Sequence, residues 1–69
     1  MVEVFKTDVR KKQNARKLES IIKNYFPNHR INFDLEDCDK IFRIEGNHIS
    51  TSKVIEIFEQ EGFLCEALQ

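Results

Sequence analysis

The chain has 69 residues, of which 41% are hydrophobic and 33% charged, with 2 Gly and 1 Pro. This composition predicts a single folded domain over residues 1–69, too small for a deep catalytic pocket, so we expect a surface site and no enzyme activity. The formal net charge of −1 differs from the basic balance of duplex-DNA binders. No apolar run approaches the roughly 20 residues of a membrane helix, and no secretory signal is visible, so the cytoplasm is the expected compartment.

The first half of the chain predicts a strand followed by an amphipathic helix. Residues Val2–Thr7 are rich in β-branched and aromatic side chains, but apolar residues occur on both sides, so the inward face stays open. Residues 8–12 are polar and basic, as in a loop. A helix is predicted from about Gln13 until Pro27 ends it. Its apolar stripe consists of Ala15, Leu18, Ile21, Ile22 and Tyr25.

The second half predicts a hairpin, a helix and a last strand. Apolar and polar residues alternate over 30–36 and again over 40–45, with a turn at 37–39, as in an antiparallel hairpin with one buried face. Ser50 or Thr51 can cap the next helix, and Gly62 is placed to end it in a left-handed conformation. The buried stripe of this helix is expected at Val54, Ile57 and Phe58, with Ile55 at its margin. Residues 63–68 form the final strand, whose inward side chains are expected to be Phe63, Cys65 and Ala67.

The predicted order of elements is β-α-β-β-α-β. Each helix has one apolar stripe and the central hairpin has one apolar face, so the economical arrangement places both helices on one face of a four-stranded antiparallel sheet. The sequence therefore predicts an α+β, ferredoxin-like sandwich. This architecture hosts many unrelated functions, so it assigns none by itself.

Two segments resemble the heavy-metal-associated domains of copper chaperones and heavy-metal-transporting ATPases. Residues 49–68, with the run Glu61-Gly62-Phe63, resemble the final helix and strand of that family, and residues 33–46 resemble its central hairpin. The resemblance covers nearly the whole chain in element order. It implies the same ferredoxin-like fold and a relationship to metal-handling proteins.

The metal ligands of that family are absent from the first loop. Family members carry M-x-C-x-x-C there, since two thiolates at this spacing bind Cu(I) or Zn(II). With Val9 on the Met position, the two Cys positions fall on Lys11 and Asn14. An ammonium group repels a cation and a carboxamide is no soft ligand, so we expect no metal site and no cofactor. The resemblance then implies a degenerate member with a protein-docking role, and residual metal binding is the alternative.

A basic cluster occupies the place of the ligand loop. It consists of Arg10, Lys11, Lys12, Arg16 and Lys17. The cluster lies at the predicted start of a helix, where backbone N–H groups add partial positive charge. We therefore expect it to bind an anion or an acidic protein surface, with a solvated helix start as the alternative.

Charge is distributed unevenly along the chain. Residues 1–30 carry eight basic and three acidic side chains, whereas residues 31–69 carry three basic and nine acidic ones. The acidic side chains of the second predicted helix, Glu56, Glu59 and Glu61, could attract the basic cluster of another copy. This polarity leaves weak head-to-tail self-association open.

Cysteines and histidines offer few further sites. Cys38 should lie at the same end of the sheet as the first loop, which allows a single-thiol contact but no chelating pair. Cys65 is expected to be a small buried hydrophobe. His29 and His48 lie in short polar connectors and are expected to be solvated, with ligand or pH-sensing roles as the alternative.

Two other functions rank behind docking. An RRM-type domain that binds single-stranded nucleic acid shares the topology, but its stacking aromatics would be replaced on the open sheet face by Asn32, Asp34, Ile41 and Arg43. An acylphosphatase-like enzyme could use Arg10 and Asn14 to hold a phosphate and a water, yet the Gly-rich loop of that class is missing.

Overall fold

Four strands and two helices follow the predicted order in the computed structural model, which describes residues 1–68. The elements are β1 (Val2–Thr7), α1 (Lys12–Tyr25), β2 (Arg30–Asp34), β3 (Ile41–Glu45), α2 (Thr51–Gln60) and β4 (Cys65–Ala67). No helix within residues 1–68 is long and apolar enough to cross a membrane.

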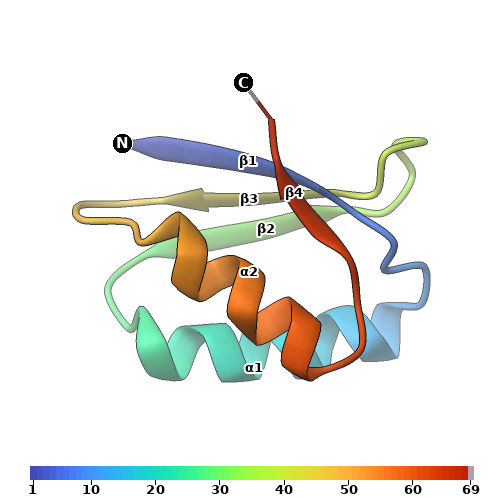
Figure 1. The fold of residues 1–69 in the computed structure, drawn as a ribbon, viewed down its shortest axis with the longest axis horizontal. Helices are drawn as coiled ribbons and strands as arrows, with labels where there is room; N and C mark the ends of the chain where they lie inside the picture. Colours follow the sequence, from blue (N-terminus) through green and yellow to red (C-terminus); the bar gives the residue numbers. More distant parts are fainter. Residues whose placement is uncertain (69) are drawn as a thin grey trace.

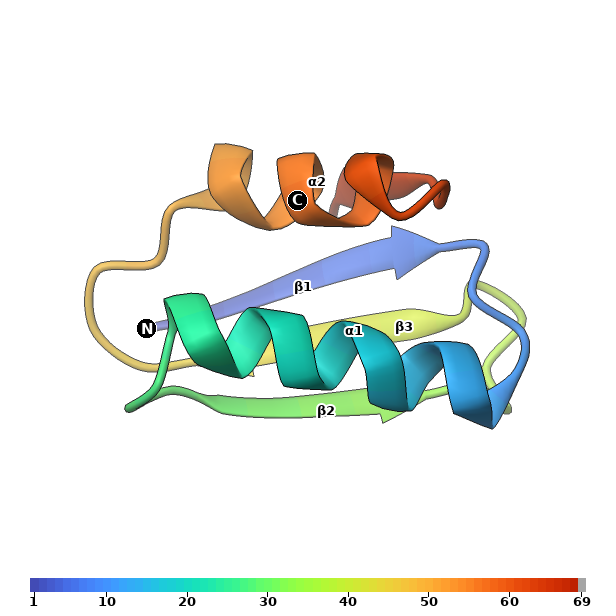
Figure 2. The same cartoon turned by 90° about the horizontal axis from the view of Figure 1, so that it is seen from below.

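The strands form one antiparallel sheet in the order β2-β3-β1-β4. Both helices cover the same face of this sheet, as the two views in Figures 1 and 2 show, and the other face is open. The predicted two-layer α+β sandwich is confirmed. Because β3 lies antiparallel between β1 and β2, those two strands run in the same direction, and the loops that follow them lie at the same end of the sheet.

The inward face of β1 is the one that carries Phe5 and Thr7. Phe5 is fully buried and Thr7 is 7% exposed, whereas Val2 on the other side is 51% exposed. The register with β3 runs without a bulge from Val2↔Glu45 to Lys6↔Ile41. Thr7 can point inward because its hydroxyl donates a hydrogen bond of 2.6 Å to the carbonyl of Lys40.

Aromatic side chains form the centre of the core. The Phe42 ring lies 4.9 Å from Phe33, 5.3 Å from Phe58 and 6.0 Å from Phe5, measured between centroids. These residues come from three strands and α2, so the cluster joins the sheet to the helical layer. Ala15, Leu18 and Ile22 complete the core from α1, and Val54, Ile57 and Phe58 from α2, as their spacing predicts.

Tyr25 does not belong to the buried stripe of α1, contrary to the prediction. Its side chain is 54% exposed, and Phe26, 7% exposed, takes the core position just after the helix. The Lys53 ammonium nitrogen lies 4.2 Å from the centroid of the Tyr25 ring. Tyr25 therefore contributes to the contact between the two helices at the surface instead of to the core.

The loop between β2 and β3 is longer than predicted. β2 ends at Asp34, whose carboxylate accepts a hydrogen bond of 3.3 Å from the Glu36 N–H. β3 begins only at Ile41, because Lys40 has a φ of +48°, which an extended strand does not allow. The resulting six-residue loop contains Cys38 and its acidic neighbours.

Both predicted ends of α2 are confirmed. Ser50, not Thr51, is the N-cap, and its hydroxyl accepts a hydrogen bond of 3.2 Å from the Lys53 N–H. At the other end Gly62 has a φ of +87°, and the N–H groups of Gly62 and Phe63 bond to the carbonyls of Glu59 and Phe58. This pattern is a Schellman motif, which ends the helix and turns the chain toward β4.

Candidate partner-binding surface at the first loop

The first loop is held in place at both of its sides. The Thr7 N–H bonds to the carbonyl of Asp39 at 3.0 Å, and the Thr7 hydroxyl accepts from the Val9 N–H at 3.2 Å. The Asp8 carboxylate accepts a hydrogen bond of 2.9 Å from the N–H of Leu64. Val9 is fully buried. The backbone before α1 is therefore fixed against the β2–β3 loop and the start of β4, and it presents the next residues at defined positions.

No side chain within the described residues caps the N-terminus of α1. Lys11 occupies the N-cap position with φ −101° and ψ 138°, its side chain makes no capping hydrogen bond, and the first turn contains no acidic residue. The N–H of Asn14 bonds to the carbonyl of Lys11 at 3.1 Å, which places the two residues in one turn. Free backbone N–H groups at this end favour a negatively charged partner.

Four of the five basic side chains in the predicted cluster are unpaired. Arg10, Lys11, Lys12 and Arg16 are exposed, and none of them forms an ion pair with another residue in 1–68. These four residues are called the basic patch below. Lys17 differs, because its ammonium lies 3.1 Å from a carboxylate oxygen of Glu61 and so connects α1 to the end of α2.

A shallow groove of about 310 Å³ adjoins the basic patch between α1 and β2. Lys12 and Arg16 line it from the helix, and Phe33 and Leu35 line it from the strand and the residue that follows. Phe33 and Leu35 are only partly buried, so the groove has an apolar floor open to solvent. The sequence alone does not predict this groove, because the groove depends on how α1 lies relative to the edge of the sheet.

The acidic side chains of α2 are largely occupied within the chain. Glu61 pairs with Lys17, and Glu56 forms a hydrogen-bonded ion pair with Lys53 at 3.1 Å. That hydrogen bond raises the pKa of Lys53. Among the three glutamates expected to attract another copy, only Glu59 forms no ion pair with residues 1–68.

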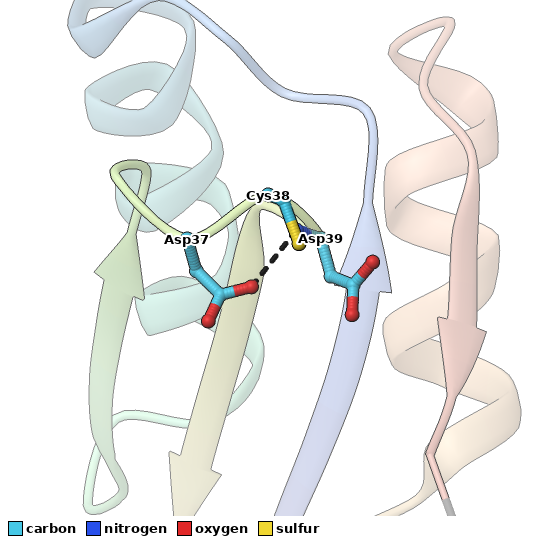
Figure 3. A group of neighbouring side chains, drawn as sticks. All are labelled: Asp37, Cys38 and Asp39. Carbon is cyan, nitrogen blue, oxygen red and sulfur yellow. Dashed lines mark hydrogen bonds between the residues drawn. The ribbon is translucent and has the colours of Figure 1, made fainter.

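Cys38 lies at the same end of the sheet as the first loop, as the topology requires, since the adjacent Asp39 accepts the hydrogen bond from Thr7. Figure 3 shows its thiol between the side chains of Asp37 and Asp39. Their ligand atoms lie within 4.8 Å of one another, and no other group of three or more His, Cys, Asp or Glu ligands occurs in residues 1–68. The Asp37 carboxylate already accepts the Asp39 N–H at 2.8 Å, and this exposed loop supplies one thiol, not two.

Cys65 is separate from this group. Its side chain packs against the core from β4, and burial, together with the nearby Glu59 carboxylate, raises the pKa of its thiol to about 12. A thiol with this pKa is almost entirely protonated near neutral pH. The prediction of a small hydrophobic role agrees with this position.

The two histidines occupy different environments. His48 is exposed, in accord with the prediction, whereas His29 is half-buried. The His29 ring packs edge-on against Phe26 with centroids 5.0 Å apart, and Nε2 donates to the Asn47 carbonyl at 2.6 Å. Its Nδ1 is buried and has no partner within residues 1–68. The expectation of a solvated His29 is therefore wrong, because the side chain fills the space above the β3–α2 turn.

Searches against protein-family models, curated proteins and solved structures found no match to the chain.

Proposed function

We propose that this chain is a non-catalytic docking module that resembles heavy-metal-associated domains, has lost their metal ligands, and binds an acidic protein surface through the basic patch. The observation that carries the proposal is a set of four exposed cations, unpaired within residues 1–68, around an uncapped helix N-terminus. A carboxylate placed there would meet both the side-chain charges and the free N–H groups of the first turn.

The local sequence is unfavourable for the isolated helix, which supports a use for it. Cations near a helix N-terminus are destabilising by about 0.3 to 1 kcal/mol each at low salt. An N-cap without Ser, Thr, Asp or Asn forgoes about 1 kcal/mol. Lys11 and Lys12 combine both disadvantages at the start of α1. A bound acidic partner would offset them, because its carboxylates would supply the missing negative charge and hydrogen-bond acceptors.

The alternatives have weaker support. A metallochaperone role needs soft ligands where Lys11 and Asn14 stand, and the Asp37, Cys38 and Asp39 group offers a single thiolate with two hard oxygen ligands. RRM-type binding needs aromatic rings on the open sheet face. The rings of Phe5, Phe33 and Phe42 are instead directed to the core.

Titration of the protein with a fluorescein-labelled 20-residue polyglutamate peptide tests the proposal. We expect fluorescence anisotropy to show saturable binding at low salt. The affinity should weaken several-fold between about 20 and 200 mM NaCl, because salt screens the attraction between the exposed cations and the glutamate carboxylates. The double variant Arg10→Gln/Lys12→Gln should lose most of this binding. The matched control Lys6→Gln/Arg43→Gln removes the same charge from the open sheet face and should bind like the wild type.

Two results would reject the proposed function. One is the absence of salt-dependent binding by the wild type. The other is an equal loss of binding in both double variants, since this would show an effect of net charge and not of the basic patch. A poly-uridine RNA of the same length, titrated in parallel, distinguishes nucleic-acid binding: RNA binding that the control variant loses and the patch variant keeps would assign the open sheet face instead.

A further inference from the structure

Within residues 1–68, the outer edge of β2 has no partner strand. β2 pairs with β3 alone, and in Figure 2 it lies at the lower border of the sheet with no element beyond it. The opposite edge, β4, has three residues, whereas β2 has five. β2 also lacks proline and lysine, two of the residues that commonly protect an exposed edge from pairing.

The hydrogen-bond register identifies which backbone groups of β2 are free. The Gly46 N–H bonds to the Met1 carbonyl, so even-numbered residues of β3 direct their backbone groups to β1 and odd-numbered ones direct theirs to β2. Because Asn32 is opposite Arg43, β2 uses its even-numbered residues toward β3. The N–H and C=O groups of Ile31 and Phe33 are therefore directed to the free edge.

We propose that β2 pairs antiparallel with β2 of a second copy, centred on Asn32, to form a symmetric dimer with a continuous eight-stranded sheet. The strand Arg30-Ile31-Asn32-Phe33-Asp34 is complementary to itself in this register. Ile31 lies opposite Phe33 of the second copy, and these are the residues whose backbone groups are free, so four inter-copy hydrogen bonds form. No other register pairs all five residues of the strand.

Charge favours the same register. Arg30 and Asp34 are exposed and project from the open face. In the proposed pairing, Arg30 lies opposite Asp34 of the second copy, and Asp34 lies opposite Arg30 of the second copy. Within its own sheet Arg30 is next to Glu45. In the dimer it has a carboxylate on both sides. The pairing is therefore attractive at both ends of the joined strands, whereas a parallel in-register arrangement would place Arg30 opposite Arg30 and Asp34 opposite Asp34.

The apolar side of the strand adds burial. Ile31 and Phe33 are on the inward face but only partly buried, and Phe33 contributes to the open floor of the groove beside α1. In the dimer each Phe33 gains contact with Ile31 of the second copy. The dimer register uses no side chain of the basic patch, and sedimentation measures it without an acidic ligand, so its test is separate from that of the proposed function.

Two charge-reversal variants, one at Arg30 and one at Asp34, test the dimer. Sedimentation velocity of the wild type should show a shift from monomer to dimer over roughly 10 µM to 1 mM, as expected for a small interface. Asp34→Arg places Arg opposite Arg twice and should sediment as a monomer throughout this range. Arg30→Asp should do the same, because it places Asp opposite Asp. An equimolar mixture of these two variants should recover dimerisation, since both strand ends are then attractive.

The controls separate dimer loss from misfolding. Asp34→Arg is the primary variant, because its neighbour in the sheet is Ile41 and not a charged residue. Circular dichroism should show the wild-type spectrum for each variant. Arg43→Asp changes the same charge one strand further in and should dimerise like the wild type. A wild type that stays monomeric at about 1 mM, or single variants that dimerise as well as the mixture, would overturn the proposal.

Discussion

The imidazole of His29 lies directly over Gly46. A Cβ atom at position 46 would be 2.6 Å from Cδ2 and 2.8 Å from Cγ of this ring, both closer than real Cβ contacts allow. The φ angle of Gly46 is +153°, which side chains rarely adopt. His29 in turn is held between Phe26 and the Asn47 carbonyl, so it cannot move aside without losing those contacts.

Gly46→Ala should therefore destabilise the domain. The backbone conformation alone costs on the order of 1 to 3 kcal/mol, and the overlap with the His29 ring adds to it. Gly62→Ala is the matched control, because φ is also positive there but nothing lies within 4 Å of the added Cβ. Urea denaturation should show the larger loss for Gly46→Ala. Equal losses for the two variants would contradict a steric role for His29.

Replacement of Lys11 by Ser should stabilise the fold. Lys11 is the N-cap of α1 and makes no capping hydrogen bond, whereas a serine hydroxyl could accept one from the first turn. The expected gain in the free energy of unfolding is about 1 kcal/mol. Ser50→Ala provides the converse test, since it removes the existing cap of α2 and should cost about the same. Denaturant titrations of both variants measure the two effects, and a Lys11→Ser protein no more stable than the wild type would contradict the prediction.

Most of the element order could be read from the sequence, because both helices and the central hairpin each have one clear hydrophobic period. The stripes of Val54, Ile57 and Phe58 and of Ala15, Leu18 and Ile22 specify the buried helix faces. Gly62 and Ser50 mark the ends of α2 through local chemistry alone. Signals of this kind involve residues within one turn of each other, so a single sequence contains them.

The predictions that were wrong depend on contacts between distant residues. Tyr25 fits the helical period of α1, but Phe26 reaches the core and Lys53, from α2, lies beside the tyrosine ring. His29 packs on Gly46, 17 positions away. At the candidate site the basic residues could be found by composition, whereas which of them remain unpaired follows only from the arrangement of the two helices.

Removal of the Phe42 ring should be far more damaging than removal of the Tyr25 ring. Phe42 is fully buried and lies within 6.0 Å of three other phenylalanine rings, whereas Tyr25 is 54% exposed. Phe42→Ala should cost about 3 to 5 kcal/mol, a large part of the stability of so small a domain. Thermal unfolding should show a modest shift for Tyr25→Ala. Similar midpoints for the two variants would mean that Tyr25, contrary to its exposure, supports the core.

The two cysteines should differ in reactivity. Cys38 is exposed on the β2–β3 loop, whereas burial raises the pKa of Cys65 to about 12. Iodoacetamide at pH 8 should label Cys38 first, and labelling of Cys65 in the Cys38→Ser protein should accelerate about tenfold per pH unit up to pH 11. Mass spectrometry of the modified peptides measures both rates. Rapid labelling of Cys65 at pH 8 would show that the strand does not shield it.

The raised pKa of Cys65 also has a consequence for stability at high pH. The unfolded thiol loses its proton near pH 9 and the folded one near pH 12, so the folded state binds more protons between these values. The free energy of unfolding should therefore decrease as pH rises from 9 to 12. Cys65→Ala should reduce this decrease in denaturant titrations at pH 8.5 and 10.5, and an unchanged pH dependence would contradict the assignment.

Cuprous ion provides the test of the proposed loss of metal binding. Titration under reducing conditions should give no saturable one-to-one complex with the wild type, because Lys11 and Asn14 offer no thiolate. Lys11→Cys/Asn14→Cys should gain such a complex. These two positions share the first turn of α1, where the Asn14 N–H bonds to the Lys11 carbonyl, and free N–H groups stabilise thiolates. The control Arg16→Cys/Glu19→Cys has the same spacing but lies inside the helix, so it should bind Cu(I) more weakly.

The outcomes of this titration test different parts of the resemblance to heavy-metal-associated domains. A one-to-one complex of the wild type that disappears in Cys38→Ser would assign metal binding to the group of Asp37, Cys38 and Asp39, and the docking proposal would then lose its premise that metal binding is gone. Failure of Lys11→Cys/Asn14→Cys to bind more tightly than its control would reject the alignment of the first loop with M-x-C-x-x-C. Tight binding by that variant alone would instead mean that the fold still supports the ligand geometry, and that two side chains at the start of α1 separate this protein from a metal carrier.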